Sequence, residues 1–130
     1  MPTIPAAALQ EFATALLAAG GATEEESRRV GPSLVDANLR GYESHGVMRI
    51  PYYLEATKTG ECESGAELTI LKESPTHITA DANWGFGQVQ AGRMMERLTE
   101  KARTSGMAIG TIIHCGHIGR LGEYCERAAA

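Results

Sequence analysis

A hydroxyl, an imidazole, a guanidinium and phenol rings crowd into residues 39–53 of this 130-residue chain. Ser44 and His45 are adjacent, and Arg49 follows His45 after four positions. If Ser44 caps a helix, His45 and Arg49 share one of its faces, so a proton-transfer group and a carboxylate-binding fork point the same way. Such a pair would suit a 2-hydroxy or 2-oxo acid. The spacing alone leaves open a capping serine beside a surface histidine and a solvated arginine.

A glycine-rich stretch at residues 112–124 has the form strand, loop, helix. Gly116, Gly119 and Gly122 would let the backbone approach a ligand closely, and the free N–H groups at the start of the following helix attract phosphate. A cofactor phosphate is therefore one hypothesis for this loop. The G-x-x-G-x-x-G spacing is neither the Rossmann fingerprint nor a Walker A loop, and a generic glycine-rich turn is the alternative.

Two other groups of residues give weaker indications. His114 and His117 flank Cys115, but no fourth ligand lies nearby in the sequence, so no metal site is predicted. Residues 81–88 join a strand to a helix, and we interpret them as a turn in which Trp84 acts as an aromatic plug.

The elements that must position these residues begin with helices. Apolar residues three and four apart predict a helix over residues 5–19. Thr23 and Glu26 have the spacing of a capping box, which predicts a second helix running towards Gly41. Pro32 lies in its interior and is expected to kink or divide it.

The later elements mix helices with strands. A third helix capped by Ser44 would run to about Lys58, although Pro51 inside it favours an irregular segment. The pattern then predicts a hairpin over 68–71 and 78–80, a helix over 86–105, a strand over 107–113 and a last helix after the glycines. This order predicts an α/β fold of the mixed α+β kind.

Composition excludes several classes of function. The chain is 43% hydrophobic and 22% charged with a net charge of -4, which is typical of a globular protein and unfavourable for a nucleic-acid partner. It has no apolar run of the roughly 20 residues that span a bilayer and no leader pattern at its start, so we expect a cytoplasmic protein without a membrane partner. The three cysteines, Cys62, Cys115 and Cys125, are odd in number and widely spaced, which predicts thiols rather than disulfides.

Three segments taken together resemble the malate and L-lactate dehydrogenase-like family, which also contains ureidoglycolate, sulfolactate and piperideine-2-carboxylate enzymes. They are residues 40–53, 81–88 and 116–124, and their order and separation are also similar to the family's. The resemblance implies hydride transfer between NAD or NADP and the C2 position of a small 2-hydroxy or 2-oxo acid, or of a related imine. It also implies an NAD(P)-binding fold distinct from the Rossmann domain.

The resemblance also implies roles for individual residues. His117 matches the histidine assigned as proton acceptor in part of the family, whereas Ser44 and His45 match a pair described elsewhere in it as a relay. These two assignments compete. Arg49 would bind the substrate carboxylate and Tyr52 would line the pocket wall. The stretch expected beside the cofactor comprises His117, Ile118, Gly119, Arg120 and Leu121.

Members of this family are considerably longer than 130 residues, so the resemblance implies the N-terminal part of such an enzyme. Residues 1–60 would form a helical segment that carries the substrate-site motif, and residues 61–130 the incomplete start of an α/β cofactor-binding domain. We expect a homodimer in the full-length form, and an inactive, poorly folded or oligomeric chain when these residues stand alone. The alternatives are a catalytically inactive fragment and an NAD(P)-binding module that lacks catalysis.

Overall fold

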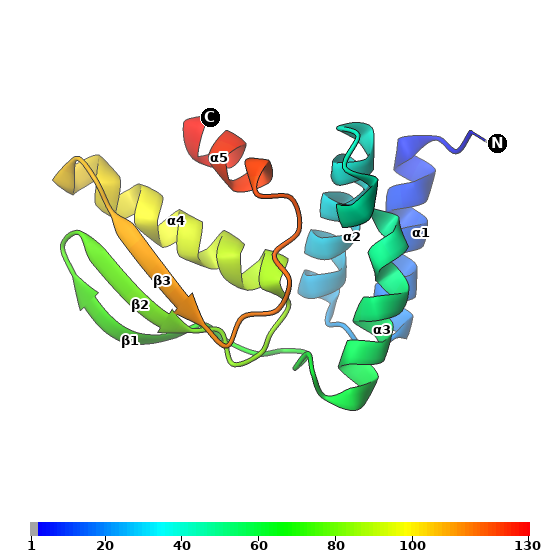
Figure 1. Cartoon of the computed structure of the whole chain (residues 1–130), viewed down its shortest axis with the longest axis horizontal. Coiled ribbons are helices and arrows are strands. Elements are labelled where there is room, and N and C mark those ends of the chain that lie inside the picture. The colour runs from blue at the N-terminus through cyan, green and yellow to red at the C-terminus, as the bar shows by residue number, and fades with distance from the viewer. Residues whose placement is uncertain (1–2) are drawn as a thin grey trace. The chain divides into compact units, whose positions relative to one another are not determined.

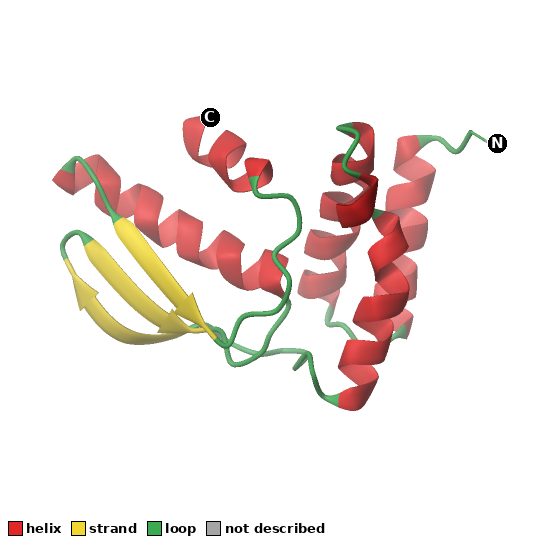
Figure 2. Cartoon of the chain, in the orientation of Figure 1, coloured by secondary structure: helices red, strands yellow, loops and turns green. Residues whose placement is uncertain are grey.

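The computed structural model describes residues 3–130 and divides into two units, Met1–Gly65 and Ala66–Ala130. The first unit is helical over its described residues, and the second combines a three-stranded sheet with helices (Figure 1 and Figure 2). The predicted α/β fold of mixed type is therefore confirmed. None of the helices in residues 3–130 is both long enough and apolar enough to cross a membrane.

The first unit packs three α-helices around a small apolar core. Its elements are α1 (Ala6–Ala19), α2 (Glu24–Leu39), the 3-10 turns η1 (Glu43–His45) and η2 (Val47–Arg49), and α3 (Ile50–Thr59). The most buried apolar side chains come from all three helices and are Ala13, Leu17, Val30, Leu34, Val35, Ala37, Tyr53 and Ala56. The helix predicted over residues 5–19 and the start of the second helix at Thr23 are both confirmed.

Pro32 does not divide the second helix, because α2 continues from Glu24 to Leu39 as one element. The neighbouring residue explains how this strain is offset. A Cβ atom on Gly31 would lie 2.6 Å from the Thr14 hydroxyl oxygen of α1, so glycine lets the two helices pack closely at this point. Proline removes only one backbone donor, and the tight packing against α1 keeps the helix continuous on both sides of it.

The third predicted helix does not begin at Ser44. Residues 43–49 instead form the two short turns η1 and η2, and Gly46 between them is extended, with φ -90° and ψ -158°. Helix α3 begins only at Ile50, with Pro51 in its first turn, where a residue without a backbone donor costs nothing. The segment is irregular before Ile50, but Pro51 is not the cause, because it lies in the first turn of a regular helix; the role of Ser44 as a helix cap is also wrong.

A buried carboxylate closes the first unit. Glu26 Oε2 accepts the Thr23 N–H at 2.8 Å, and the Thr23 hydroxyl accepts the Glu26 N–H at 3.2 Å, which is the predicted capping box. The same carboxylate accepts the Ser64 hydroxyl at 2.8 Å and the Gly65 N–H at 2.8 Å. Because Glu26 is only 2% exposed, one buried group holds both the start of α2 and the end of the unit.

The second unit contains a hairpin and a parallel crossover. Its elements are β1 (Thr69–Ser74), β2 (His77–Asp81), α4 (Gly87–Ser105), β3 (Ile109–Ile113) and α5 (Gly122–Ala129). The sheet order is β1-β2-β3; β1 and β2 are antiparallel, as the predicted hairpin requires, and β2 and β3 are parallel. Asp81 pairs with Ile113, so both parallel strands end at the same edge of the sheet.

Helix α4 covers one face of this sheet (Figure 1). One core cluster contains Ile78, Ala80 and Met94, with the partly buried Leu68, Ile70, Leu98 and Ile112 packed against it. Near the end of α4, the Lys101 ammonium lies 2.9 Å from the Glu73 carboxylate and donates to the Ser74 carbonyl oxygen at 2.8 Å. The hydrogen bond and charge of Lys101 lower the pKa of Glu73. The helix is thereby fixed to the hairpin at its C-terminal end as well as through its apolar face.

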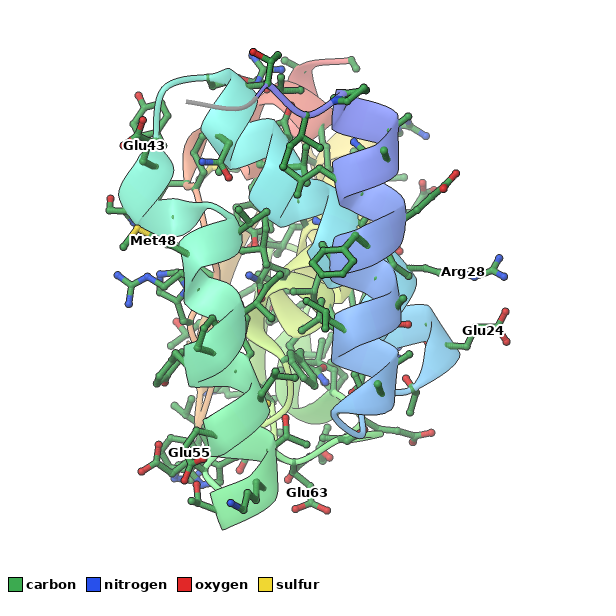
Figure 3. The ribbon with its side chains drawn as sticks, turned by 90° about the vertical axis from the view of Figure 1, so that its right-hand side faces the viewer. Glu24, Arg28, Glu43, Met48, Glu55 and Glu63 are labelled. Atoms are coloured by element: carbon green, nitrogen blue, oxygen red, sulfur yellow. The ribbon has the colours of Figure 1, made fainter. Side chains whose placement is uncertain are left out.

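Replacing Glu26 with Gln should destabilise the first unit by about 1–3 kcal/mol, because the amide cannot accept all of the buried donors that the carboxylate holds. Urea unfolding followed by circular dichroism measures this change. Glu24→Gln is the matched control, since Glu24 is in the same helical turn but pairs with Arg28 at an exposed site (Figure 3). Equal effects of the two substitutions would show that the buried carboxylate has no special role.

Candidate functional site

The double turn η1–η2 gathers three of the side chains singled out from the sequence. The Ser44 hydroxyl oxygen lies 3.0 Å from His45 Nδ1, and Arg49 Nε donates to the Ser44 carbonyl oxygen at 2.6 Å. Ser44, His45 and Arg49 are therefore neighbours, although through a folded-back arginine rather than through helical spacing. Figure 3 shows Glu43 and Met48 on the same double turn, with Met48 projecting outward. The arrangement places a hydroxyl, an imidazole and a guanidinium within one short turn.

Helix α2 fixes this turn through Asn38, which the sequence analysis did not single out. Asn38 Oδ1 accepts the Val47 N–H at 2.8 Å. A Cβ atom on Gly46 would lie 2.2 Å from the same oxygen, so only glycine allows this approach. Because the two residues are nine positions apart and lie in different elements, no helical or strand periodicity could have paired them.

The two adjacent tyrosines of α3 have different surroundings. Tyr52 is 47% exposed, whereas Tyr53 is 3% exposed and belongs to the core. Their ring centroids lie 5.5 Å apart, so the buried ring supports the exposed one. Tyr52 is therefore accessible for a ligand contact.

The glycine-rich loop of the second unit lies directly against the N-terminal end of α4. A Cβ atom on Gly87 would come within 2.3 Å of the carbonyl oxygens of both Gly116 and His117. Gly116 also donates its N–H to the Gly85 carbonyl oxygen at 3.4 Å. Glycine at position 87 therefore allows the backbone of Gly116 and His117 to lie directly against the start of α4. The His117 side chain is half-buried there.

Arg120 braces the end of the same loop. Its guanidinium is 7% exposed and forms two parallel hydrogen bonds to the Glu126 carboxylate, at 3.0 and 2.9 Å. The Tyr124 hydroxyl donates to the Ile118 carbonyl oxygen. Leu121, by contrast, is 68% exposed. The loop is thus held by side chains of α5, and the buried Arg120 guanidinium is paired with a carboxylate that is 47% exposed.

A cluster that the sequence analysis missed joins the ends of β2 and β3. His114 Nδ1 lies 2.9 Å from Asp81 Oδ2, and Asn83 donates its N–H to the other carboxylate oxygen at 2.8 Å. These two hydrogen bonds, first that of His114, lower the pKa of Asp81. The parallel register was not foreseen from the sequence, and it is this register that brings residues 81 and 114 together.

Trp84 is not the aromatic plug expected from the sequence, because its side chain is 53% exposed. Phe86, at 2% exposure, fills that buried position instead. Both residues are aromatic and lie two positions apart, so the pattern of this turn could not distinguish them. Asn83, Trp84 and His114 have positive φ angles of 48°, 60° and 47°, and they are the non-glycine residues of the described chain that do so.

The cysteines form no disulfide within the described residues. Cys62 is buried, Cys115 is half-buried in the glycine-rich loop and Cys125 is exposed on α5. Burial raises the pKa of the Cys115 thiol. Across residues 3–130, no group of three or more His, Cys, Asp or Glu side chains is placed to hold a metal ion.

Comparison with known proteins gives the family. The sequence pattern of the malate/L-lactate dehydrogenase family matches residues 4–130, so the chain belongs to this family. The chain is 35% identical over 122 residues to hydroxycarboxylate dehydrogenase B of Escherichia coli O157:H7, which covers 94% of the chain and 34% of that relative. It is 35% identical over 126 residues to malate dehydrogenase of Pyrococcus abyssi, which covers 97% of the chain and 35% of that relative.

Solved structures agree with this assignment. Malate dehydrogenase from Pyrococcus horikoshii OT3 superimposes with a TM-score of 0.95 at 32% identity, over 98% of this chain and 37% of that one. Sulfolactate dehydrogenase from Methanocaldococcus jannaschii gives a TM-score of 0.91 at 31% identity, over 95% of this chain and 36% of that one. The chain therefore spans about a third of the length of the relatives it matches.

The Asp81 carboxylate should stabilise the second unit only while it is ionised. Because its pKa is lowered in the folded chain, its contribution is present above the ordinary Asp pKa of about 3.9 and is lost as the pH falls through the lowered value. The difference in urea midpoint between the unchanged chain and Asp81→Asn should therefore be larger at neutral pH than in acid. A difference independent of pH would contradict this assignment, since the other carboxylates titrate in both proteins.

The cysteines should differ in reactivity towards iodoacetamide at neutral pH. Cys125 is exposed, whereas Cys115 combines partial burial with a raised pKa, so less of its reactive thiolate is present. Mass spectrometry of peptides sampled over time should show Cys125 alkylated first and Cys115 clearly later. Urea should abolish the difference. Equal rates in the folded chain would mean that Cys115 is not shielded.

Proposed function

We propose that this chain contributes the N-terminal part of an NAD(P)-dependent oxidoreductase that acts on the C2 position of a small 2-hydroxy or 2-oxo acid. The observation that carries the proposal is the gathering of Ser44, His45 and Arg49 in one double turn of a chain that belongs to the malate/L-lactate dehydrogenase family. Malate and sulfolactate, which appear in the names of relatives, are both 2-hydroxy acids with a second anionic group.

Each residue of the double turn has a chemical task in this proposal. Arg49 binds the substrate carboxylate, for which a planar guanidinium with five N–H donors is suited even though Nε is engaged by the Ser44 carbonyl. His45 exchanges the proton of the C2 hydroxyl, and Ser44, in contact with its Nδ1, continues the proton path. The exposed ring of Tyr52 lines the pocket wall.

His117 is the competing proton-transfer group, and the stretch His117–Leu121 lies beside the cofactor in the proposal. The glycines bring the backbone of this loop close to the backbone at the start of α4, as at Gly87 and Gly116. Arg120 is committed to Glu126, so it shapes the loop rather than offering a charge to a phosphate. When bound, NAD or NADP supplies or accepts the hydride. A cytoplasmic homodimer completes the proposal.

A chimeric enzyme tests the activity directly. This chain would replace the matching 37% of Pyrococcus horikoshii malate dehydrogenase, to which it superimposes with a TM-score of 0.95. Oxidation of NADH and of NADPH would be followed with 2-oxo acids that carry a methyl, a carboxylate or a sulfonate group. We expect turnover with at least one acid, and the preferred acid and cofactor then specify the enzyme. A folded chimera that binds NAD(P)H without turning over any acid would favour the binding module.

In the chimera, alanine at the true proton-transfer histidine should lower kcat by about 10²- to 10⁴-fold with little change in KM. His45→Ala and His117→Ala are therefore compared side by side. His77→Ala is the matched control, because His77 lies in β2 beside the Thr79 hydroxyl and has no role in the proposal. Arg49→Lys should mainly raise KM, since a bidentate contact is lost. Equal and modest losses at His45 and His117 would contradict both proton-transfer assignments.

A further inference from the structure

Trp84 combines exposure with a rigid setting. Its indole is 53% exposed at the turn between β2 and α4, and it is the single tryptophan of the chain. The backbone N–H of Trp84 donates to the His114 carbonyl oxygen at 2.7 Å, and the ring centroid of Trp84 lies 5.2 Å from that of His114 at an interplanar angle of 40°. Backbone and side chain of Trp84 are thus both held against the same residue.

His114 is itself fixed in place. The Asp81 carboxylate lies 2.9 Å from its Nδ1; the side chain of Asp81 is 20% exposed and that of His114 is 50% exposed. A second bond from the Asn83 N–H fixes the carboxylate in turn. Asp81 therefore positions the His114 imidazole, and the imidazole in turn contacts the Trp84 indole.

The backbone adopts unfavourable conformations to maintain this arrangement. Asn83, Trp84 and His114 all have positive φ angles, which are sterically disfavoured for side-chain-bearing residues and especially for bulky ones. Such strain tends to occur where a structure holds a side chain ready for a ligand. Here its effect is to present a large aromatic face to solvent while the neighbouring Phe86 fills the core.

The cluster also lies where open α/β sheets bind ligands, beyond the carboxyl ends of parallel strands. Asp81 ends β2 and His114 directly follows β3. The turn that carries Trp84 is bonded to the glycine-rich loop, because the Gly116 N–H donates to the Gly85 carbonyl oxygen. The indole is therefore part of the same loop assembly that carries His117.

We propose that Trp84, supported by His114 and Asp81, is a stacking platform for a planar heteroaromatic ring, and specifically for the adenine or the nicotinamide ring of the dinucleotide. This inference rests on the proposed function, which it deepens by assigning a ring-binding position. The exposed face of a fixed indole offers dispersion contact and a negative π-surface to any flat base, at little cost in side-chain entropy.

The sole tryptophan serves as its own probe. The chain is titrated with adenosine monophosphate, with nicotinamide mononucleotide and with ribose 5-phosphate, while Trp84 emission is recorded. We expect saturable quenching by at least one of the two nucleotides, which identifies the base that stacks, and none by ribose 5-phosphate, which lacks a heteroaromatic base. Absence of quenching by both nucleotides, or equal quenching by ribose 5-phosphate, would overturn the proposal. A change that follows protein concentration alone would assign the surface to self-association and overturn it as well.

Variants measured by calorimetry separate stacking from folding. Trp84→Ala should weaken binding of the quenching nucleotide about fivefold or more, whereas Trp84→Phe should retain most of the affinity. Phe12→Ala is the matched control, since Phe12 is a 61% exposed aromatic residue on α1 without a histidine support. His114→Ala should lower the emission anisotropy of Trp84 and weaken binding together. Unchanged affinity in Trp84→Ala would overturn the proposal even if the chain binds nucleotides elsewhere.

The outcomes for this inference and for the proposed function are distinguishable. If the chimeric enzyme turns over a 2-oxo acid with NADH or NADPH while Trp84→Ala leaves its KM for the cofactor unchanged, the platform is wrong and the function stands. If Trp84 binds a nucleotide ring but the chimera is inactive, the platform stands as a nucleotide site and the dehydrogenase function fails.

Discussion

The parallel pairing of β2 with β3 is the constraint on which the second unit depends. Its ladder does not end with the strands, because Ala82 donates to the Ile113 carbonyl at 3.0 Å and Trp84 donates to the His114 carbonyl at 2.7 Å. The turn before α4 and the glycine-rich loop before α5 are therefore two sides of one extended pairing. A parallel crossover needs a long connection, and α4 provides it while covering the apolar face of the sheet. Every chemical group in these loops takes its position from that pairing.

In the first unit, which has no strands among its described residues, a helix positions the candidate site residues. The double turn η1–η2 is held by α2, because the amide oxygen of Asn38 accepts the Val47 N–H. Gly46 makes that approach possible, since any side chain there would collide with the amide. The glycine that follows His45 is thus explained by packing.

The sequence predicted the elements better than their contacts. The helix over 5–19, the capping box at Thr23 and the hairpin follow from local patterns, and local hydrogen bonding and apolar periodicity are what produced them. The predictions from Pro32 and Ser44 were wrong. Close packing against α1 keeps α2 continuous through Pro32, and the extended Gly46 prevents a helix from starting at Ser44. The pairing of Asp81 with His114 spans 33 positions and depends on strand register, which no spacing rule reports. The exposure of Trp84 rather than Phe86 was equally outside any pattern of residue types.

The hydrogen bonds of the Glu26 carboxylate link the start of α2 to residues that are synthesised later. The contacts among α1, α2 and α3 are local in sequence, so this bundle can assemble early as the chain emerges during synthesis. Two of the donors that satisfy the Glu26 carboxylate, however, belong to Ser64 and Gly65, 38 and 39 residues later. Until those residues leave the ribosome, the carboxylate has only its own helix start as a partner and must remain hydrated. The helical unit therefore reaches its final dry state only when synthesis of the sheet unit has already begun.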